Sequence, residues 1–225
     1  MASKPIPTRP LPRLYLATPA IADPQSLAQA LPSLLEAADV AAVLLRLEPS
    51  DPRTLISRIK TLAPIIQQKG AALLLEGHVD LVARAGADGA HLQGLAALDE
   101  ALPTLKPDRI AGVGHLETRH DSMTAGERGA DYVLFGEPNE KGQRPSMAAI
   151  CERLAWWDEL FELPSVAYAA TLEDVGAFAA AGADFILAAD FVWTAPEGPA
   201  AALRATEAAI RKAHAALPAR AEAQG

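Results

Sequence analysis

Gly129-Ala130-Asp131-Tyr132-Val133-Leu134-Phe135-Gly136 joins the end of a helix-like segment directly to a short apolar run. Glycine just past a helix can take the left-handed conformation that ends it, so the chain is free to enter a strand. The apolar run is short and rich in β-branched and aromatic residues, which is typical of a strand buried on both faces. The same small-small-Asp step occurs at Ala37-Ala38-Asp39, Gly86-Ala87-Asp88 and Gly182-Ala183-Asp184.

The spacing of these four steps predicts the fold. They begin 49, 43 and 53 residues apart, which leaves room for about two strand–helix units in each interval. The rhythm favours eight parallel strands, and so an α/β protein with a single (β/α)₈ TIM barrel. We expect the strands at 13–18, 41–47, 71–75, 89–93, 109–114, 132–136, 165–169 and 185–189.

The predicted domain organisation is simple. Residues 1–12 are proline-rich and read as an extended lead-in, residues 13–217 as the barrel, and residues 218–225 as a disordered tail. Asp23-Pro24 and Asp51-Pro52 each place an N-cap carboxylate before a proline that begins a helix. Residues 118–121 and 171–174 resemble capping boxes with Asp at the reciprocal position.

Composition excludes several classes of protein. Half of the 225 residues are apolar, enough for one sizeable core, and the formal net charge of −8 argues against non-specific nucleic-acid binding. The single cysteine, Cys151, allows no intramolecular disulfide and is expected to be a buried structural thiol. No signal peptide or run of membrane-spanning length is evident, so we expect a cytoplasmic protein without a membrane partner.

A barrel of this kind carries its chemistry at the carboxyl ends of its strands. Asp39, Asp88, Asp131 and Asp184 precede strands, so they lie at the opposite end and are expected to stabilise loops. Other polar side chains follow the predicted strands and are candidates for the site.

Arg46 ends an otherwise apolar strand, so its guanidinium is expected to point into the barrel mouth. A positive fork there suits a phosphate or a carboxylate. The alternative is a salt bridge to Glu48 or Glu76.

The polar loop 136–145 is long enough to fold over a ligand, and its Lys141 and Arg144 could clamp an anion. The alternative is an ordinary solvated loop. His78, His115 and His120 show no metal-binding spacing, so the metal ligands stay unknown, although Mg²⁺ held by oxygens and phosphate would leave a weaker signature.

Several blocks of the chain, in their order and spacing, resemble the thiamine phosphate synthase and TenI family of small (β/α)₈ barrels over about residues 12–217. The blocks are Leu14-Tyr-Leu-Ala-Thr18, Val43-Leu-Leu-Arg46, Arg84-Ala-Gly-Ala-Asp-Gly-Ala-His-Leu92, Ala111-Gly-Val113, Gly129-Ala-Asp-Tyr-Val-Leu-Phe-Gly136 and Ala181-Gly-Ala-Asp184.

The resemblance implies a transferase that joins hydroxymethylpyrimidine diphosphate to thiazole phosphate, releases pyrophosphate and uses Mg²⁺. Lys, Arg and metal would stabilise the departing pyrophosphate while the pyrimidine becomes carbocation-like. The TenI branch instead tautomerises a thiazole without metal. Its proton-transferring histidine corresponds to Glu137 here, which could serve as a general base.

The chain departs from the family pattern at several of these positions. Glu48 replaces a lysine, and Glu76-Gly77-His78 replaces Asn-Asp-Arg. Gln93-Gly94-Leu95-Ala96 replaces Gly-Gln-x-Asp, so the metal-binding aspartates are not matched, although Glu76 could substitute as an oxygen ligand. Ala169-Ala170 replaces a phosphate-binding Gly-Gly. A non-catalytic homologue that binds a ligand therefore stays a third hypothesis.

After the last strand, this chain has Ala189-Asp190 where the family has a serine-containing pair. The negative charge of Asp190 would repel ligand oxygens. Gly114-His115 replaces Ser-Thr, whereas Lys141 is kept.

We expect a small phosphorylated ligand, and the apolar helix at 200–217 leaves a homo-oligomer open. The predicted catalytic residues are Arg46, Lys141 and Glu137. The predicted substrate-binding residues are Glu48, Glu76, Gln93, His115, Tyr168, Ala169 and Ala170.

Overall fold

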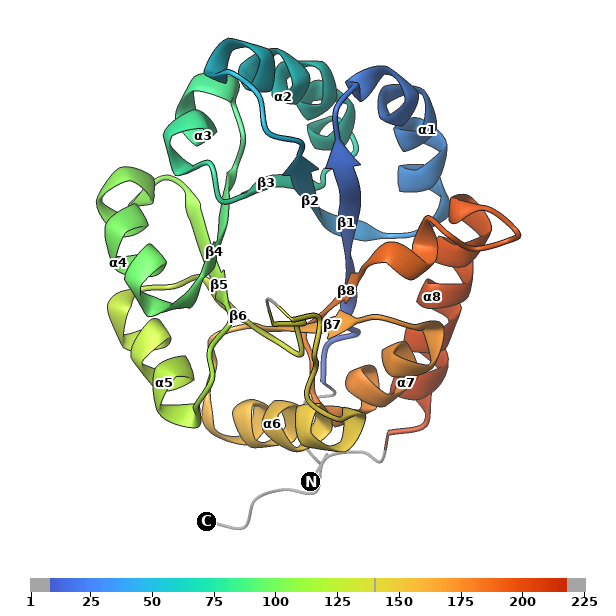
Figure 1. Cartoon of the computed structure of the whole chain (residues 1–225). Coiled ribbons are helices and arrows are strands. Elements are labelled where there is room, and N and C mark those ends of the chain that lie inside the picture. Colours follow the sequence, from blue (N-terminus) through green and yellow to red (C-terminus); the bar gives the residue numbers. More distant parts are fainter. Residues whose placement is uncertain (1–8, 140, 218–225) are drawn as a thin grey trace, which may run out of the picture.

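Eight parallel strands close into a barrel in chain order, with β1 paired to both β2 and β8. The computed structural model describes residues 9–139 and 141–217. The helices lie outside the strands, and Figure 1 looks down on the carboxyl ends of the strands. The predicted (β/α)₈ TIM barrel is confirmed.

The strands lie close to their predicted positions. They are β1 (Arg13–Ile21), β2 (Val40–Leu47), β3 (Ala72–Glu76), β4 (Gly89–Gln93), β5 (Ile110–Gly114), β6 (Tyr132–Phe135), β7 (Ser165–Ala169) and β8 (Phe185–Ala188). The largest difference is β1, which continues past Pro19 to Ile21. A register shift between Ala17 and Ala20 accommodates the proline, which has no N–H to donate, so that Ala20 pairs with Arg46.

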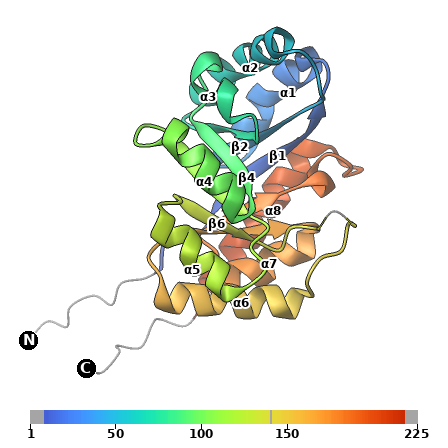
Figure 2. The ribbon, with the colours of Figure 1, turned by 60° about the vertical axis from the view of Figure 1, so that its left-hand side comes forward.

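The helices form the outer ring seen from two directions in Figures 1 and 2. They are α1 (Pro24–Ala37), α2 (Pro52–Gln67), α3 (Val79–Ala85), α4 (Gly94–Leu105), α5 (Arg119–Arg128), α6 (Met147–Leu160), α7 (Leu172–Ala181) and α8 (Pro199–Ala215), with a short 3₁₀ helix η1 (Asp190–Val192) after β8. Asp23 and Asp51 accept backbone N–H bonds as N-caps, and both predicted capping boxes are formed.

Helix α8 packs on its own barrel, because its apolar side chains at Ala202, Leu203 and Ile210 are buried within the single chain. The homo-oligomer that the sequence left open is not tested by this packing. Across residues 9–139 and 141–217, no helix is both long and apolar enough to span a membrane. The predicted tail 218–225 and most of the predicted lead-in 1–12 lie outside the described residues.

Side chains divide between two apolar layers according to the alternation of each strand. One set packs between the strands and the helices, and it includes Leu16, Val43 and Leu45. The other fills the barrel interior and includes Tyr15, Leu44, Leu74, Tyr132 and Tyr168. Because inward positions recur at every second residue, Arg46 continues the interior row of Leu44 and reaches the barrel mouth.

The aspartates of the repeated step stabilise the amino-terminal end of the barrel. One carboxylate oxygen of Asp88 accepts the backbone N–H of Leu73 at 2.7 Å, and Asp131 and Asp184 do the same for Ala111 at 2.7 Å and Ser165 at 2.8 Å. Each bond ties the strand after the aspartate to the strand before it. The prediction that these residues are structural is confirmed.

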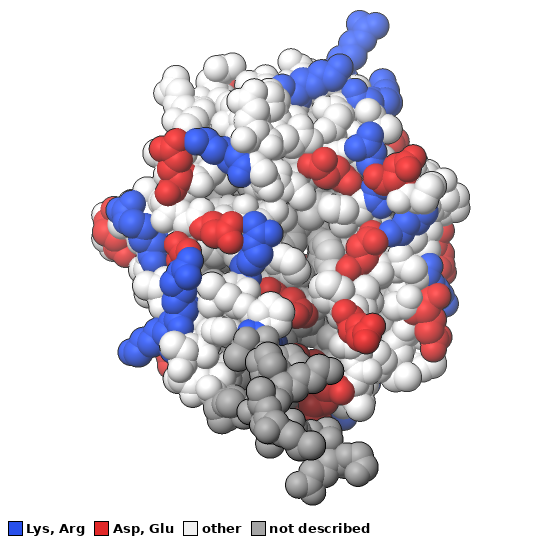
Figure 3. Space-filling view, turned by 180° about the vertical axis from the view of Figure 1, so that it is seen from behind, with Lys and Arg blue, Asp and Glu red and all other residues white. Residues whose placement is uncertain are grey.

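Asp39 differs from the other three, because it pairs with the side chain of Arg13 at 2.9 Å instead of with a backbone N–H. This end of the barrel, seen in Figure 3, carries interspersed acidic and basic side chains. They include the Lys69–Glu36 and Lys106–Asp131 pairs.

We predict that Asp184→Ala lowers the free energy of unfolding by about 1–3 kcal/mol, because it leaves the buried N–H of Ser165 without a partner. The matched control Asp39→Ala removes only an exposed ion pair and should cost less than about 1 kcal/mol. Urea unfolding of both variants measures the difference. Equal losses would show that the backbone bond is not what Asp184 contributes.

Candidate functional site

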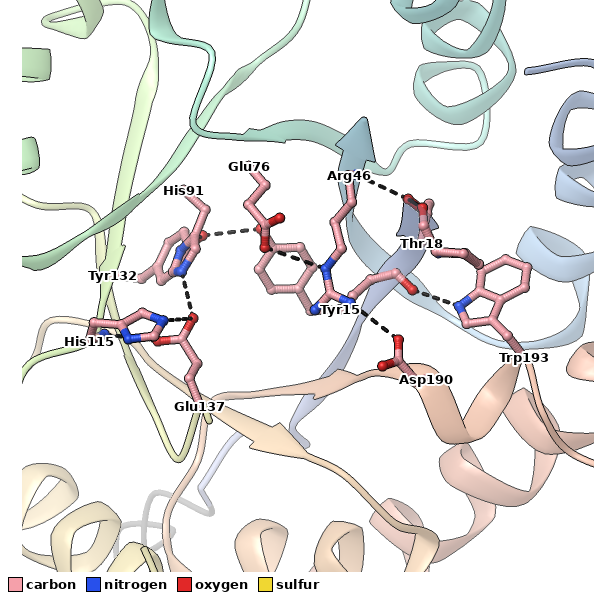
Figure 4. Close-up of polar contacts among 12 residues, drawn as sticks. Tyr15, Thr18, Arg46, Glu76, His91, His115, Tyr132, Glu137, Asp190 and Trp193 are labelled. Atoms are coloured by element: carbon pink, nitrogen blue, oxygen red, sulfur yellow. Dashed lines mark hydrogen bonds and ion pairs between the residues drawn. The ribbon is translucent and has the colours of Figure 1, made fainter. Parts of the chain in front are cut away.

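Arg46 lies at the carboxyl end of β2, inside the barrel mouth, between two carboxylates (Figure 4). Its Nε is 3.4 Å from Oε1 of Glu76, and its Nη1 is 3.2 Å from Oδ1 of Asp190. The salt bridge to Glu76 that the sequence offered as an alternative is therefore formed. Glu48 is exposed beyond the end of β2, and its backbone N–H bonds to Ile21.

The surroundings of Arg46 keep it positively charged. Burial alone would lower the pKa of its guanidinium, but Glu76, Tyr168 and Asp190 raise it above its usual value. The exposure of the two carboxylates differs, since Glu76 keeps 37% of its side-chain area accessible and Asp190 keeps 70%. Among the described residues, the buried Nε of Arg46 has no hydrogen-bond partner of good geometry.

A second polar group runs through the barrel interior. Nε2 of His91, on β4, is 3.0 Å from Oε1 of Glu137, and Nδ1 is 2.9 Å from the hydroxyl of Tyr132. The Tyr132 hydroxyl is in turn 3.1 Å from that of Tyr15. Tyr15, His91 and Tyr132 lie on β1, β4 and β6, and Glu137 is the second residue after β6. The barrel therefore brings together side chains that are far apart in the sequence (Figure 4).

Glu137 is a nearly buried carboxylate with donors on both oxygens. Its Oε2 accepts the backbone N–H of His115 at 2.9 Å, and the ring Nε2 of His115 lies 3.8 Å from Oε1. Burial would raise the pKa of Glu137, but the charges and hydrogen bonds of His91 and His115 outweigh it, so the pKa lies below its usual value. Glu137 is thus ionised at neutral pH.

Two glycines of β5 make room for this polar group. A Cβ at Gly112 would overlap the ring of Tyr132, and a Cβ at Gly114 would overlap the carboxylate of Glu137. Glycine is therefore required on this strand because large side chains approach it from β6 and beyond.

His78 and His115 both have a left-handed backbone, with φ of 47° and 52°. His115 directly follows β5, and His78 is separated from the end of β3 by Gly77. Non-glycine residues in this region are strained, and such strain gathers at functional sites.

Arg144, in the loop after β6, is engaged within the chain. That guanidinium already donates to the carbonyls of Gly136 and Tyr168, at 2.8 and 2.7 Å, and pairs with Asp174 at 3.1 Å. Arg144 therefore joins the loop to β7 and α7, whereas the sequence had left an anion clamp or a solvated loop open. Lys141 is exposed, and its backbone N–H is held by the side chain of Asn139.

The backbone after β7 is likewise engaged within the chain. One oxygen of the buried Asp174 accepts the N–H groups of Ala170 and Thr171, at 2.8 and 3.1 Å. Ala169 is fully buried in β7. A ligand phosphate could use the Ala170 N–H only by displacing Asp174.

Two cavities flank the His91–Glu137 pair. A cavity of about 450 Å³ lies beside the loops after β5 and β6, and its wall includes Glu137, His115, Leu116 and Ile150. A cavity of about 790 Å³ lies between the loop after β3 and α4. Its lining includes Glu76, His78, Asp80, His91, Gln93 and Glu100.

Of the predicted site residues, Arg46 and Glu76 meet directly, as do His115 and Glu137. His91, Tyr132 and Tyr15 were not predicted as site residues. The signal was the alternation itself, which gives His91 the same orientation as Gln93 at the strand end. Nothing local indicated that Glu137 would be its partner, 46 residues away.

We predict that Glu137→Gln destabilises the protein at neutral pH by an amount that depends on pH. A carboxyl whose folded pKa lies below its unfolded value stabilises the fold above the unfolded pKa, about 4.3. That stabilisation disappears as the pH falls through the folded pKa. The difference from wild type in urea unfolding should therefore shrink in acid. Glu162→Gln, at an exposed position, is the control, and a pH-independent difference for Glu137→Gln would contradict the prediction.

Comparison with known proteins identifies the family. The family model described as thiamine monophosphate synthase matches residues 14–190. The thiamine-phosphate synthase of Rhodospirillum centenum is 41% identical over 194 residues, covering 85% of this chain and 94% of that protein. That of Hyphomonas neptunium is 36% identical over 211 residues, covering 89% and 94%. The solved thiamine phosphate pyrophosphorylase from Pyrococcus furiosus shares the fold, with a TM-score of 0.72, 20% identity, and coverage of 89% of this chain and 96% of that one. The chain belongs to the thiamine monophosphate synthase family.

Proposed function

We propose that this protein joins hydroxymethylpyrimidine diphosphate to thiazole phosphate and releases pyrophosphate. The observation that carries the proposal is the 41% identity, over nearly the full length of both chains, to a protein named thiamine-phosphate synthase. The barrel mouth supports it, because one side holds a partly buried cation, Arg46, and the other a partly buried anion, Glu137. A small phosphorylated ligand is the partner that this reaction requires.

The reaction separates charge, and the site has groups of both signs. The C–O bond to the diphosphate breaks with its electron pair leaving on pyrophosphate, and the thiazole nitrogen then supplies the pair for the new C–N bond. Arg46, with Lys141 from the loop after β6, would stabilise the negative charge on pyrophosphate. Glu137 would stabilise the positive charge on the pyrimidine. No proton needs to be transferred for these bonds to balance.

The carboxylates beside Arg46 fit Mg²⁺ poorly. Mg²⁺ is usually held by one or two carboxylates together with substrate phosphates. The carboxylates beside Arg46 are Glu76 and Asp190, and both already pair with it. Neither carboxylate is thus free to hold the Mg²⁺ that the family resemblance implies.

A second candidate is the tautomerisation of a thiazole phosphate. It is favoured by the ionised Glu137 with two histidines beside it, because a fixed carboxylate next to a cavity can accept a proton from carbon. A ligand-binding protein without turnover is the third outcome. We also propose a cytoplasmic location. We further propose that the protein has no nucleic-acid partner, and the net charge of −8 supports this second point.

The test is pyrophosphate release from purified protein given both precursors, with and without Mg²⁺. We expect release only when both precursors are present. Arg46→Ala should lower kcat/KM by about 10²–10³-fold, because it removes the cation at the mouth. Arg211→Ala, which breaks an exposed pair with Glu207 on α8, should leave the rate unchanged.

The contradicting outcomes are distinct. Conversion of the thiazole alone, without release of pyrophosphate, would establish the second candidate. No conversion, together with thermal stabilisation by either precursor, would establish ligand binding alone.

A further inference from the structure

We propose that His91 is a positioning residue, backed by Tyr132 and Tyr15, which holds Glu137 in one orientation with its accessible edge toward the cavity beside His115. The proposal deepens the function proposed above, since it concerns the carboxylate assigned there to the developing positive charge. His91 is 1% exposed, so it would act on a ligand through Glu137.

The hydrogen bonds of His91 follow from the chemistry of its partners. A carboxylate can only accept, so the hydrogen between His91 and Glu137 must lie on Nε2. A phenol can donate or accept, so Tyr132 can bond Nδ1 whether or not that nitrogen carries a hydrogen. Tyr15 then supplies or takes the remaining hydrogen bond of Tyr132. The imidazole is therefore fully hydrogen-bonded in either protonation state.

The packing leaves the imidazole one orientation. His91 is 1% exposed, and its ring stacks on that of Tyr132 with centroids 5.7 Å apart and planes 6° apart. Tyr132 is itself confined by Gly112 on one side and by the Tyr15 ring on another, with the two ring centroids 6.0 Å apart and the planes at 89°. Rotation of His91 would break two buried hydrogen bonds, each costly to leave unmade.

The second oxygen of Glu137 is fixed from a different strand. The left-handed turn at His115 aims its backbone N–H at Oε2. Donors from β4 and from the loop after β5 thus set the plane of the carboxylate, while the His115 ring, 30% exposed, borders the cavity. The ring is 3.8 Å from the carboxylate, beyond hydrogen-bond distance, so it is free to contact a ligand.

The charges around Glu137 agree with this role. The titratable groups that face it are His91 from β4, His115 after β5 and Tyr132 from β6, with Tyr15 of β1 behind them. The two histidines hold the pKa of the carboxyl down despite its burial. Burial and the nearby Glu137 raise the pKa of both phenols. The two tyrosines therefore stay neutral and add no negative charge beside Glu137.

The first test measures the Glu137 carboxyl directly, by carbon NMR of its side chain as a function of pH in the full chain. His91→Gln can still donate through its side-chain amide, but it loses the charge and the rigid ring of the imidazole, so the pKa of Glu137 should rise. Tyr132→Phe should raise it less, because His91 remains but loses its support. Tyr168→Phe is the matched control, since it removes a phenol that faces Arg46 in the same barrel, and it should leave the Glu137 titration unchanged.

Circular dichroism checks that each variant is folded, and Tyr15→Phe replaces Tyr132→Phe if the latter is not. An unchanged Glu137 titration in folded His91→Gln would overturn the proposal. So would an equal shift in the Tyr168→Phe control.

The second test uses turnover. His91→Gln should lower kcat by about 10²-fold, the cost of a misplaced catalytic group, while KM changes by less than about threefold. The acid limb of the kcat profile should move to higher pH, following the raised pKa of Glu137. Equal changes in kcat and KM, with no movement of the limb, would indicate a purely structural role. If the wild type released no pyrophosphate, the proposed function would fail while the NMR titration still decided the positioning role.

Discussion

The bond from an aspartate carboxylate to the backbone N–H of the preceding strand is the constraint on which the site depends. Asp88, Asp131 and Asp184 make it at the amino ends of β4, β6 and β8. Side chains alternate along a strand, so a slip of one residue would turn every inward group outward. Asp88 stands three residues before His91, and Asp131 directly precedes Tyr132. By fixing register at one end of the barrel, these aspartates decide which polar groups meet at the other.

A polar group inside a narrow barrel is costly unless each member is satisfied. Here hydrogen bonds between the polar side chains offset the cost. They join Tyr15 to Tyr132, Tyr132 to His91 and His91 to Glu137 at 2.9 to 3.1 Å. The space comes from β5, whose glycines yield volume to side chains of neighbouring elements. The barrel interior buries less apolar surface here than an apolar layer would. In return, the hydrogen bonds hold the Glu137 carboxylate in one orientation.

Local patterns were sufficient for the fold and insufficient for the partners within the site. The Gly-Ala-Asp steps, the helix caps and the apolar runs are each contained in a few consecutive residues, so the strands could be placed closely. The alternation of β2 also placed Arg46 at the mouth. The partners of Arg46 and Arg144, however, lie on distant elements: Asp190 comes from the residue pair after β8 and Asp174 from α7. The charge of Arg144 and the length of its loop suggested that it could bind an anion. The three-dimensional structure shows that its guanidinium pairs with Asp174 and donates to two backbone carbonyls.

The pairing of Arg46 bears on how an anion could bind in a mouth rich in carboxylates. Its two partners are not equivalent, since Glu76 at the end of β3 keeps 37% of its side-chain area accessible and Asp190 at the start of η1 keeps 70%. An exposed ion pair contributes little free energy, so a ligand phosphate can displace Asp190 at small cost. Glu76 would remain and keep the guanidinium oriented. The acidic residues at the mouth are therefore compatible with the anion binding proposed above, because the exposed Asp190 side chain has room to leave Arg46 for solvent when a ligand anion takes its place.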